Sequence, residues 1–249
     1  MTTIIEARNI TKTFGQEKNQ TVALNNVSIA IKANEFVSVM GPSGSGKSTL
    51  LFALGGMDTL DEGCVYINGV SLYEMDDNRV ADFRRKNMGF VFQNPTMLPS
   101  LDILDNIMLP SFEDYKNDKS ALTQKAQNLM KLAGIEGTEN RKITEVSGGQ
   151  LQRASICRAV LHGPEILFGD EPTGALNSKS SEEILDLFEE LNKNGMTILL
   201  VTHDAKVSAR ANRVIFMKDG ALESELYFEN EDHQTRLALI NQKMSDLGI

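Results

Sequence analysis

The chain has 249 residues, of which 41% are hydrophobic and 24% charged, an ordinary composition for one large globular domain with an insertion. Its formal net charge of −9 at pH 7 argues against a nucleic-acid partner, which would require a basic surface to neutralise phosphates. No segment reaches the roughly 20 apolar residues that cross a bilayer, so we expect any membrane role to depend on a partner protein.

Short β-branched runs alternate along the chain with longer amphipathic stretches, which predicts an α/β fold with a largely parallel sheet. The predicted strands are Ile4–Ala7, Val27–Ile31, Phe36–Met40, Val65–Ile67, Gly89–Phe92, Ile166–Gly169, Thr197–Val201 and Arg213–Met217. Helices are predicted to begin near Lys47, Asp77, Gln150, Lys179 and Ala205.

The strand pattern disappears between residues 94 and 162, where segments such as 120–132 and 150–161 have helical character. This pattern predicts a helical subdomain (94–162) inserted into a core formed by residues 1–93 and 163–227. From Asp232 onward, apolar residues recur at helical spacing, so residues 228–249 are predicted to form a helical tail that packs on the body.

A glycine-rich loop separates the strand Phe36–Met40 from the helix that begins at Lys47, and its sequence fits G-x-x-x-x-G-K-S/T. In such a loop, backbone N–H groups and a helix N-terminus converge on phosphate oxygens, the lysine adds a positive charge, and the serine is suited to Mg²⁺. The predicted nucleotide-binding residues are Gly41, Pro42, Ser43, Gly44, Ser45, Gly46, Lys47, Ser48 and Thr49. A chance match is expected in about 1% of chains of this length. Kinases, GTPases and motor ATPases share this loop, so it does not decide among them.

A second candidate anion site lies at the sequence Ser147-Gly148-Gly149-Gln150, immediately before a predicted helix. A serine hydroxyl, two glycines and a helix N-terminus suit a negatively charged ligand. Taken alone, the same four residues are also consistent with an ordinary capped helix start.

Two adjacent carboxylates, Asp170 and Glu171, follow the apolar strand Ile166–Gly169. Ligands of open α/β sheets bind at the carboxyl edge of the strands, which would place this pair beside the phosphate loop. Asp170 is predicted to hold Mg²⁺ and Glu171 to act as general base for an attacking water. In isolation, a solvated acidic turn would be the better interpretation; the phosphate loop in the same chain favours the catalytic one.

The serine-glycine loop resembles the signature loop of the ATP-binding cassette (ABC) family, which reads L-S-G-G-Q, with Val146 here in place of leucine. The resemblance covers almost the whole chain. It implies a P-loop NTPase fold in residues 1–227, with a RecA-like core, a mainly parallel sheet, an antiparallel β edge and an inserted helical subdomain. It also implies ATP and Mg²⁺ as cofactors, hydrolysis of ATP to ADP and phosphate, and a homodimer in which each signature loop closes over the nucleotide of its partner.

The same resemblance assigns roles to residues outside these loops. Gln93 matches a glutamine that contacts Mg²⁺ and the membrane partner, and His203 matches a histidine that contacts the γ-phosphate. Phe14 stands where the family stacks an aromatic ring on adenine, although a core phenylalanine is a serious alternative. Asn177 replaces the aspartate of most relatives. The resulting prediction comprises catalytic residues Glu171, His203, Lys47 and Gln93, metal ligands Ser48, Gln93 and Asp170, and further nucleotide-binding residues Phe14, Ser147, Gly148, Gly149 and Gln150.

The residues 171–179 and the polar tail at 232–235 resemble most the ABC transporters of the bacitracin-type peptide-resistance branch. Macrolide exporters and lipoprotein-release machines belong to the same group and remain alternatives. The resemblance implies a multi-span membrane permease as partner, a sensor kinase reached through that permease, and a peripheral location on the cytoplasmic face of the membrane. A small-molecule kinase would not explain Ser147 to Gln150, and an insert of this size has no room for the coiled-coil arms of chromosome-maintenance relatives.

Overall fold

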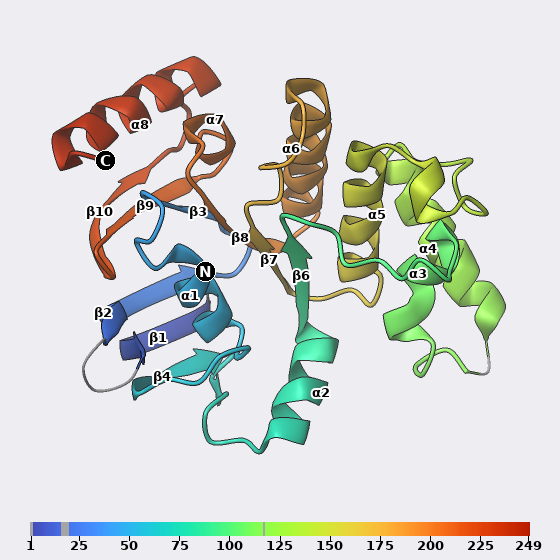
Figure 1. Ribbon diagram of the computed structural model, residues 1–249, viewed down its shortest axis with the longest axis horizontal. Coiled ribbons are helices and arrows are strands. Elements are labelled where there is room, and N and C mark those ends of the chain that lie inside the picture. Colours follow the sequence, from blue (N-terminus) through green and yellow to red (C-terminus); the bar gives the residue numbers. More distant parts are fainter. Residues whose placement is uncertain (1, 16–19, 117) are drawn as a thin grey trace.

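The structure is a computed structural model that describes residues 2–15, 20–116 and 118–249, and Figure 1 shows its arrangement. A larger sheet runs through the centre in the order β10-β9-β3-β8-β7-β6. Its strands are β3 (Phe36–Met40), β6 (Met88–Phe92), β7 (Ile166–Asp170), β8 (Thr197–Thr202), β9 (Arg213–Lys218) and β10 (Ala221–Tyr227). All neighbours pair in parallel except β10, which runs antiparallel to β9. The predicted α/β class with a mainly parallel sheet is confirmed.

A smaller antiparallel sheet lies against the first and has the order β2-β1-β4-β5. Its strands are β1 (Thr3–Phe14), β2 (Thr21–Lys32), β4 (Glu62–Ile67) and β5 (Val70–Ser71). The predicted segments Ile4–Ala7 and Val27–Ile31 are only parts of β1 and β2, because the pairing register shifts at several points and interrupts the alternating pattern. The sequence prediction also missed β5 and β10, which are short or half-exposed.

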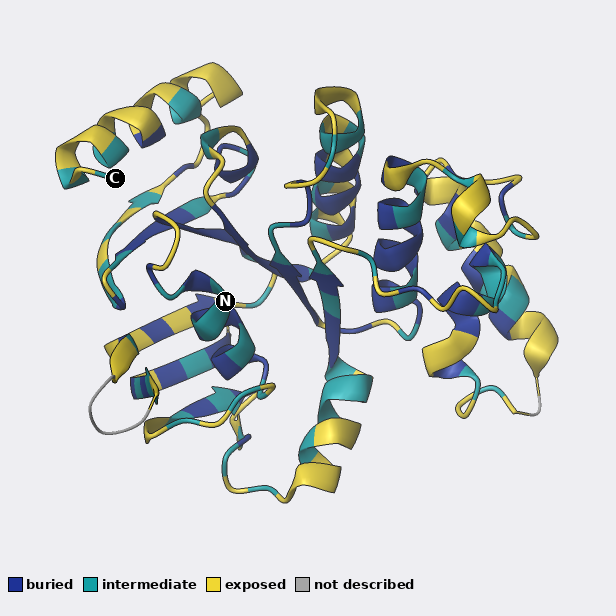
Figure 2. Cartoon of the chain, in the orientation of Figure 1, coloured by how far each residue is buried: buried dark blue, intermediate teal, exposed yellow. Residues whose placement is uncertain are grey.

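Alternating side chains divide the core into two layers on opposite faces of the larger sheet, as the pleat of a β-strand requires. On β8, Leu199 and Val201 point into the layer shared with the smaller sheet and α1 (Lys47–Leu54). Ile198 and Leu200 point into the other layer, which α5 (Gly148–Val160), α6 (Ser178–Lys193) and α7 (Ala205–Ser208) cover. Figure 2 shows the central strands buried between exposed outer helices.

Residues 94–162 contain α3 (Ile103–Met108), a 3-10 turn (Leu109–Ser111), α4 (Lys119–Leu132), a second 3-10 turn (Ile143–Glu145) and α5. Outside this segment, α2 (Asp77–Asn87) leads into β6. Within the described part of residues 94–162, the β pairing consists of one isolated bridge between Asp102 and Lys142. The boundaries of the inserted subdomain stay a prediction.

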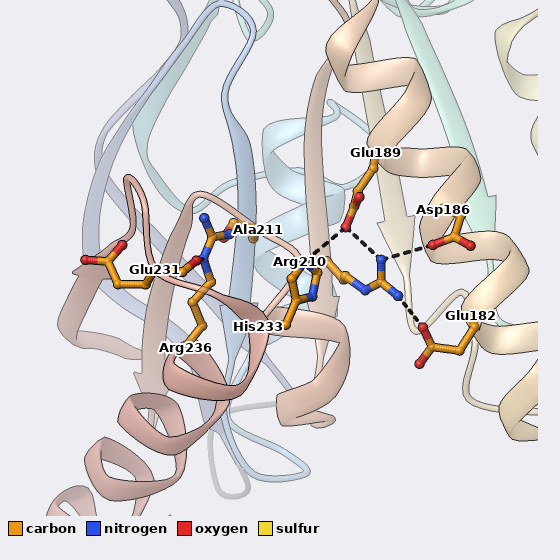
Figure 3. Close-up of polar contacts among 8 residues, drawn as sticks. All are labelled: Glu182, Asp186, Glu189, Arg210, Ala211, Glu231, His233 and Arg236. Carbon is orange, nitrogen blue, oxygen red and sulfur yellow. Dashed lines mark hydrogen bonds and ion pairs between the residues drawn. The ribbon is translucent and has the colours of Figure 1, made fainter.

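Helix α8 (His233–Leu247) packs its buried Ile240 on the core layer that α5, α6 and α7 cover. Asp232 caps the N-terminus of α8 by accepting a hydrogen bond from the Thr235 amide at 2.8 Å. Close by, Arg210 joins the segment after α7 to α6 (Figure 3). Its guanidinium contacts the carboxylates of Glu189 at 2.9 Å and Asp186 at 3.0 Å, and that of Glu182. None of the helices in the described ranges combines the length and hydropathy needed to cross a membrane.

Candidate active site

The phosphate loop joins the end of β3 to the start of α1 and depends on its glycines. Gly44 and Gly46 have φ of 81° and 99°, the left-handed region that side chains disfavour. A Cβ at Gly46 would also overlap the carbonyl oxygen of Ala23 on β2. No side chain caps α1 within the described structure, so the amides of its first turn are free to bind an anion.

Lys47 crosses the mouth of this loop, where its ammonium donates hydrogen bonds to the carbonyl oxygens of Gly41 and Pro42, both at 2.8 Å. Burial lowers the pKa of Lys47, and the nearby carboxylates of Glu171 and Asp170 partly oppose this effect. A buried ammonium whose hydrogen-bond acceptors are two neutral carbonyls is incompletely compensated. The loop therefore presents a positive charge that fits a phosphate group.

Ser48 and Asp170 meet across the site, with the Ser48 hydroxyl donating to Oδ1 of Asp170 at 2.8 Å. Burial raises the pKa of Asp170, the charge of Glu171 raises it further, and the Ser48 hydrogen bond and the charge of Lys47 lower it. A cation placed here would offset the cost of burying this carboxylate. The described residues contain no group of three or more His, Cys, Asp or Glu side chains arranged for a metal. The oxygen pair suits an ion such as Mg²⁺, which takes one or two protein ligands and completes its shell with phosphate and water.

Glu171 lies in a strained turn that begins where β7 ends. Its φ is 47°, a left-handed conformation that persists only where surrounding contacts hold it. The Glu171 amide donates to the Val201 carbonyl at 3.0 Å, and the Gly174 amide donates to the Glu171 carbonyl at 3.0 Å. These bonds place the carboxylate at the same edge as the phosphate loop.

Thr202, the last residue of β8, and His203, which directly follows it, orient the carboxylate of Glu171. The Thr202 hydroxyl donates to Oε2 of Glu171 at 3.1 Å, and Nδ1 of His203 lies 2.8 Å from Oε1. The Glu171 side chain is 18% exposed and that of His203 is 68% exposed, so the histidine remains accessible to a ligand. Sequence reasoning missed Thr202, because a threonine at a strand end gives no distinguishing local signal.

Gln93 follows β6, next to the Glu171 turn, because β6 and β7 pair with Phe92 opposite Asp170. A Cβ added to Gly174 would lie 2.8 Å from Nε2 of Gln93, so this glycine lets the side chain pack against the turn. Gln93 is exposed and does not line the cavity of about 580 Å³ that adjoins the phosphate loop. Its predicted metal contact would require the side chain to move.

A cavity of about 580 Å³ is lined by half of the predicted nucleotide-binding residues, including Lys47 and Ser48. Its lining residues are Phe14, Thr21, Ala23, Ser43, Gly44, Gly46, Lys47, Ser48, Thr49, Glu171 and His203. Phe14 is 45% exposed at its rim, which rules out the alternative of a core phenylalanine. The ammonium of Lys12 lies 5.2 Å from the centre of the Phe14 ring. Sequence reasoning missed Thr21 and Ala23, since their proximity depends on the β1–β2 pairing.

The serine-glycine loop forms a capped helix start at α5. The Ser147 hydroxyl accepts from the Gln150 amide at 3.2 Å, and the Ser147 amide donates to Oε1 of Gln150 at 2.9 Å. The local geometry is therefore that of an ordinary capped helix start, the alternative that the sequence left open. Ser147 and Gly148 are nevertheless exposed and lie outside the cavity that the chain's own phosphate loop forms.

Asn177, the departure from the family's aspartate, caps α6 by accepting a hydrogen bond from the Ser180 amide at 2.9 Å. Asparagine and aspartate serve equally well at such a position, so the substitution preserves the helix start.

A phosphate loop, an adjacent acid pair and a strand-end histidine at one edge of a parallel sheet define a P-loop nucleoside triphosphatase. The family described as "ABC transporter" matches residues 24–174. This chain belongs to that family. It is an ABC transporter subunit that binds and hydrolyses ATP.

Individual relatives and a solved structure support this assignment. The chain is 40% identical to the bacitracin export ATP-binding protein BceA of Halalkalibacterium halodurans, over 98% of this chain and 97% of that protein. It is 39% identical to the macrolide export ATP-binding/permease protein MacB of Mannheimia succiniciproducens, over 96% of this chain but only 36% of that protein. A solved dimer of the cassette MJ0796 bound to ADP and Pi matches with a TM-score of 0.84 and 40% identity, covering 92% of this chain and 100% of that one. The matched MJ0796 cassette is thus a dimer, and the matched MacB protein is named as an ATP-binding and permease protein.

Proposed function

We propose that two copies of this chain sandwich two ATP molecules, each bound in one copy's cavity and closed by Ser147 and Gly148 of the other. The observation that carries this proposal is the exposed tip of α5, which lies outside the chain's own cavity and still presents a helix N-terminus suited to an anion. The dimeric cassette at 40% identity supports it. Such a dimer has an isologous interface, so both sites are equivalent.

In this arrangement Glu171 accepts a proton from the attacking water. The oxygen of that water forms a bond to the γ-phosphorus while the bond between the γ-phosphorus and ADP breaks. His203 and Thr202 hold the carboxylate. We assign to the exposed His203 ring a contact with the γ-phosphate. Lys47 stabilises the outer phosphates, while Phe14 stacks on adenine at the rim of the cavity. A small-molecule kinase would leave the loop from Ser147 to Gln150 and His203 without a role.

We assign Mg²⁺ to Ser48 and Asp170, with Gln93 as a further ligand once its side chain turns inward. The burial of the Asp170 carboxylate and its 2.8 Å contact with Ser48 support this assignment. When bound, the ion would neutralise phosphate charge during hydrolysis.

We further propose that the chain drives a multi-span permease at the cytoplasmic face of the membrane, and that the exported substrate is an antimicrobial peptide of the bacitracin kind. The bacitracin export relative, matched over nearly its full length, supports this choice. A macrolide-type exporter is the second candidate because of the macrolide export relative. Lipoprotein release and a sensor kinase that joins through the permease rest on the resemblance of the sequence alone.

Reconstitution tests the transport proposal. The chain would be co-expressed with the permease that co-purifies with it in mild detergent, and the complex would be placed in lipid vesicles. ATP hydrolysis would then be measured with bacitracin or with a macrolide. We expect bacitracin to stimulate hydrolysis and the macrolide to leave it unchanged. Stimulation by the macrolide alone would transfer the assignment to the second candidate, and purification with RNA or DNA in place of a permease would contradict transport.

Replacing Ser147 with aspartate tests the two-copy site. Aspartate keeps the helix cap, so α5 stays intact, but its negative charge opposes the phosphate of the partner's nucleotide. We expect the turnover number to fall at least about tenfold, as for 1.4 kcal/mol of lost stabilisation, while binding of ATP to the monomer changes less than about twofold. Steady-state hydrolysis and a nucleotide titration measure the two quantities. An equal loss of both would remove the second copy from the site.

A further inference from the structure

Gln152 lies one turn inside α5 and is only 1% exposed. Its side-chain amide Nε2 donates two hydrogen bonds, to the main-chain carbonyl of Phe92 at 2.8 Å and to that of Pro172 at 2.8 Å. Phe92 is the last residue of β6, whereas Pro172 lies in the turn that follows β7. One buried NH₂ group thus joins three segments that lie far apart in the sequence.

Both carbonyls adjoin residues of the reaction site. Phe92 immediately precedes Gln93, and Pro172 immediately follows Glu171. The Glu171 backbone is held at a φ of 47°, so the turn depends on its surroundings for its shape. The Pro172 carbonyl lies one residue beyond that strained position, so a hydrogen bond to it restrains the turn that carries the Glu171 carboxylate.

We propose that Gln152 is a positioning residue that sets the Glu171 turn and the end of β6 from the same helix whose tip carries Ser147. This inference rests on the proposed function, because the tip of α5 would meet the partner's ATP while Gln152 holds the chain's own base. A displacement of α5 on dimer closure is thereby transmitted to Glu171 through one amide.

The chemistry of the contact explains why an amide is needed. Two carbonyl oxygens both accept hydrogen bonds, so the group between them has to supply two protons. Leucine fills similar space but supplies none, and an ionised glutamate would direct negative charge at both carbonyls. Asparagine has the NH₂ group but is one methylene too short to reach both.

Asn192 offers a matched control at the other edge of the sheet. Its amide Nδ2 likewise donates to two main-chain carbonyls, Asn34 at 3.1 Å and Met196 at 2.8 Å. These residues precede β3 and β8 at their amino ends, away from the nucleotide cavity. Asn192→Leu therefore removes the same type of contact without touching the site.

The test compares the full-length variants Gln152→Leu, Gln152→Asn and Asn192→Leu. Turnover at saturating ATP, affinity for a fluorescent ATP analogue and the thermal unfolding midpoint would be measured for each. We expect the turnover number of both Gln152 variants to fall at least about tenfold, with nucleotide affinity within about twofold of wild type, because α1 and its loop are untouched. Asn192→Leu should lower the unfolding midpoint and keep wild-type turnover. If Gln152→Leu does not fold, Gln152→Asn carries the comparison.

Adding Glu171→Gln separates a failure of this inference from a failure of the proposed dimer. We expect Glu171→Gln with or without Gln152→Leu to form the ATP-bound dimer at the same ATP concentration, as seen by size-exclusion chromatography, because the Ser147 tip is unchanged. Wild-type turnover in the Gln152 variants, or equal losses in Gln152→Leu and Asn192→Leu, would overturn the positioning role. Absence of a dimer in Glu171→Gln itself would refute the sandwich instead.

Discussion

Glu171→Gln is expected to reduce ATP hydrolysis by about 10²- to 10⁴-fold, the range that a positioned general base contributes. Glutamine has nearly the same shape and can still accept the hydrogen bond that Thr202 donates to Oε2 at 3.1 Å. It cannot take a proton from water at neutral pH. Binding of ATP should therefore survive, and the dimer should accumulate in its ATP-bound form because the step that releases it is blocked.

Phosphate release and size-exclusion chromatography in the presence of ATP would measure these two effects. Glu165→Gln is the matched control, since Glu165 is an exposed carboxylate at the opposite end of the same strand segment, where it accepts from Asn68 at 2.9 Å. It should hydrolyse ATP at the wild-type rate. Wild-type hydrolysis by Glu171→Gln would show that another group is the base.

Lys47→Ala should weaken nucleotide binding by about ten- to one-hundredfold and abolish measurable turnover. A hydrogen bond to a charged group contributes about 1.5–3 kcal/mol, which corresponds to this range of affinity. The ammonium is already held at the loop mouth by the Gly41 and Pro42 carbonyls, so it needs little reorganisation to meet a phosphate. Removal leaves those carbonyls facing the anion without a cation between them.

Isothermal titration calorimetry with ATP would measure this loss of affinity. Lys86→Ala removes the same charge from an exposed position on α2, where Lys86 pairs with Asp82 at 2.7 Å, and should leave affinity unchanged. Tight ATP binding with normal turnover in Lys47→Ala would mean that the phosphates bind elsewhere.

The sequence alone determined the chemistry of the phosphate loop and the acid pair. Lys47 and Ser48 lie in a short continuous segment whose residue types predict a strand, a loop and a helix. Asp170 and Glu171 are adjacent residues at the end of a predicted strand. Local interactions of this kind are encoded by neighbours in the chain. The helix start at Ser147 is also encoded by neighbouring residues, so both its cap and its suitability for an anion could be predicted from the sequence.

Only the tertiary structure decided how distant segments meet. Thr202 reaches Glu171 because β7 and β8 are adjacent and parallel, and Phe14 reaches the cavity rim through the β1–β2 pairing. Gln152 joins carbonyls 60 and 20 residues away. Contacts with main-chain carbonyls place almost no demand on the identity of the accepting residue. They therefore leave no pattern in the sequence, and the position of α5 against two strand ends has to be known before they can be seen.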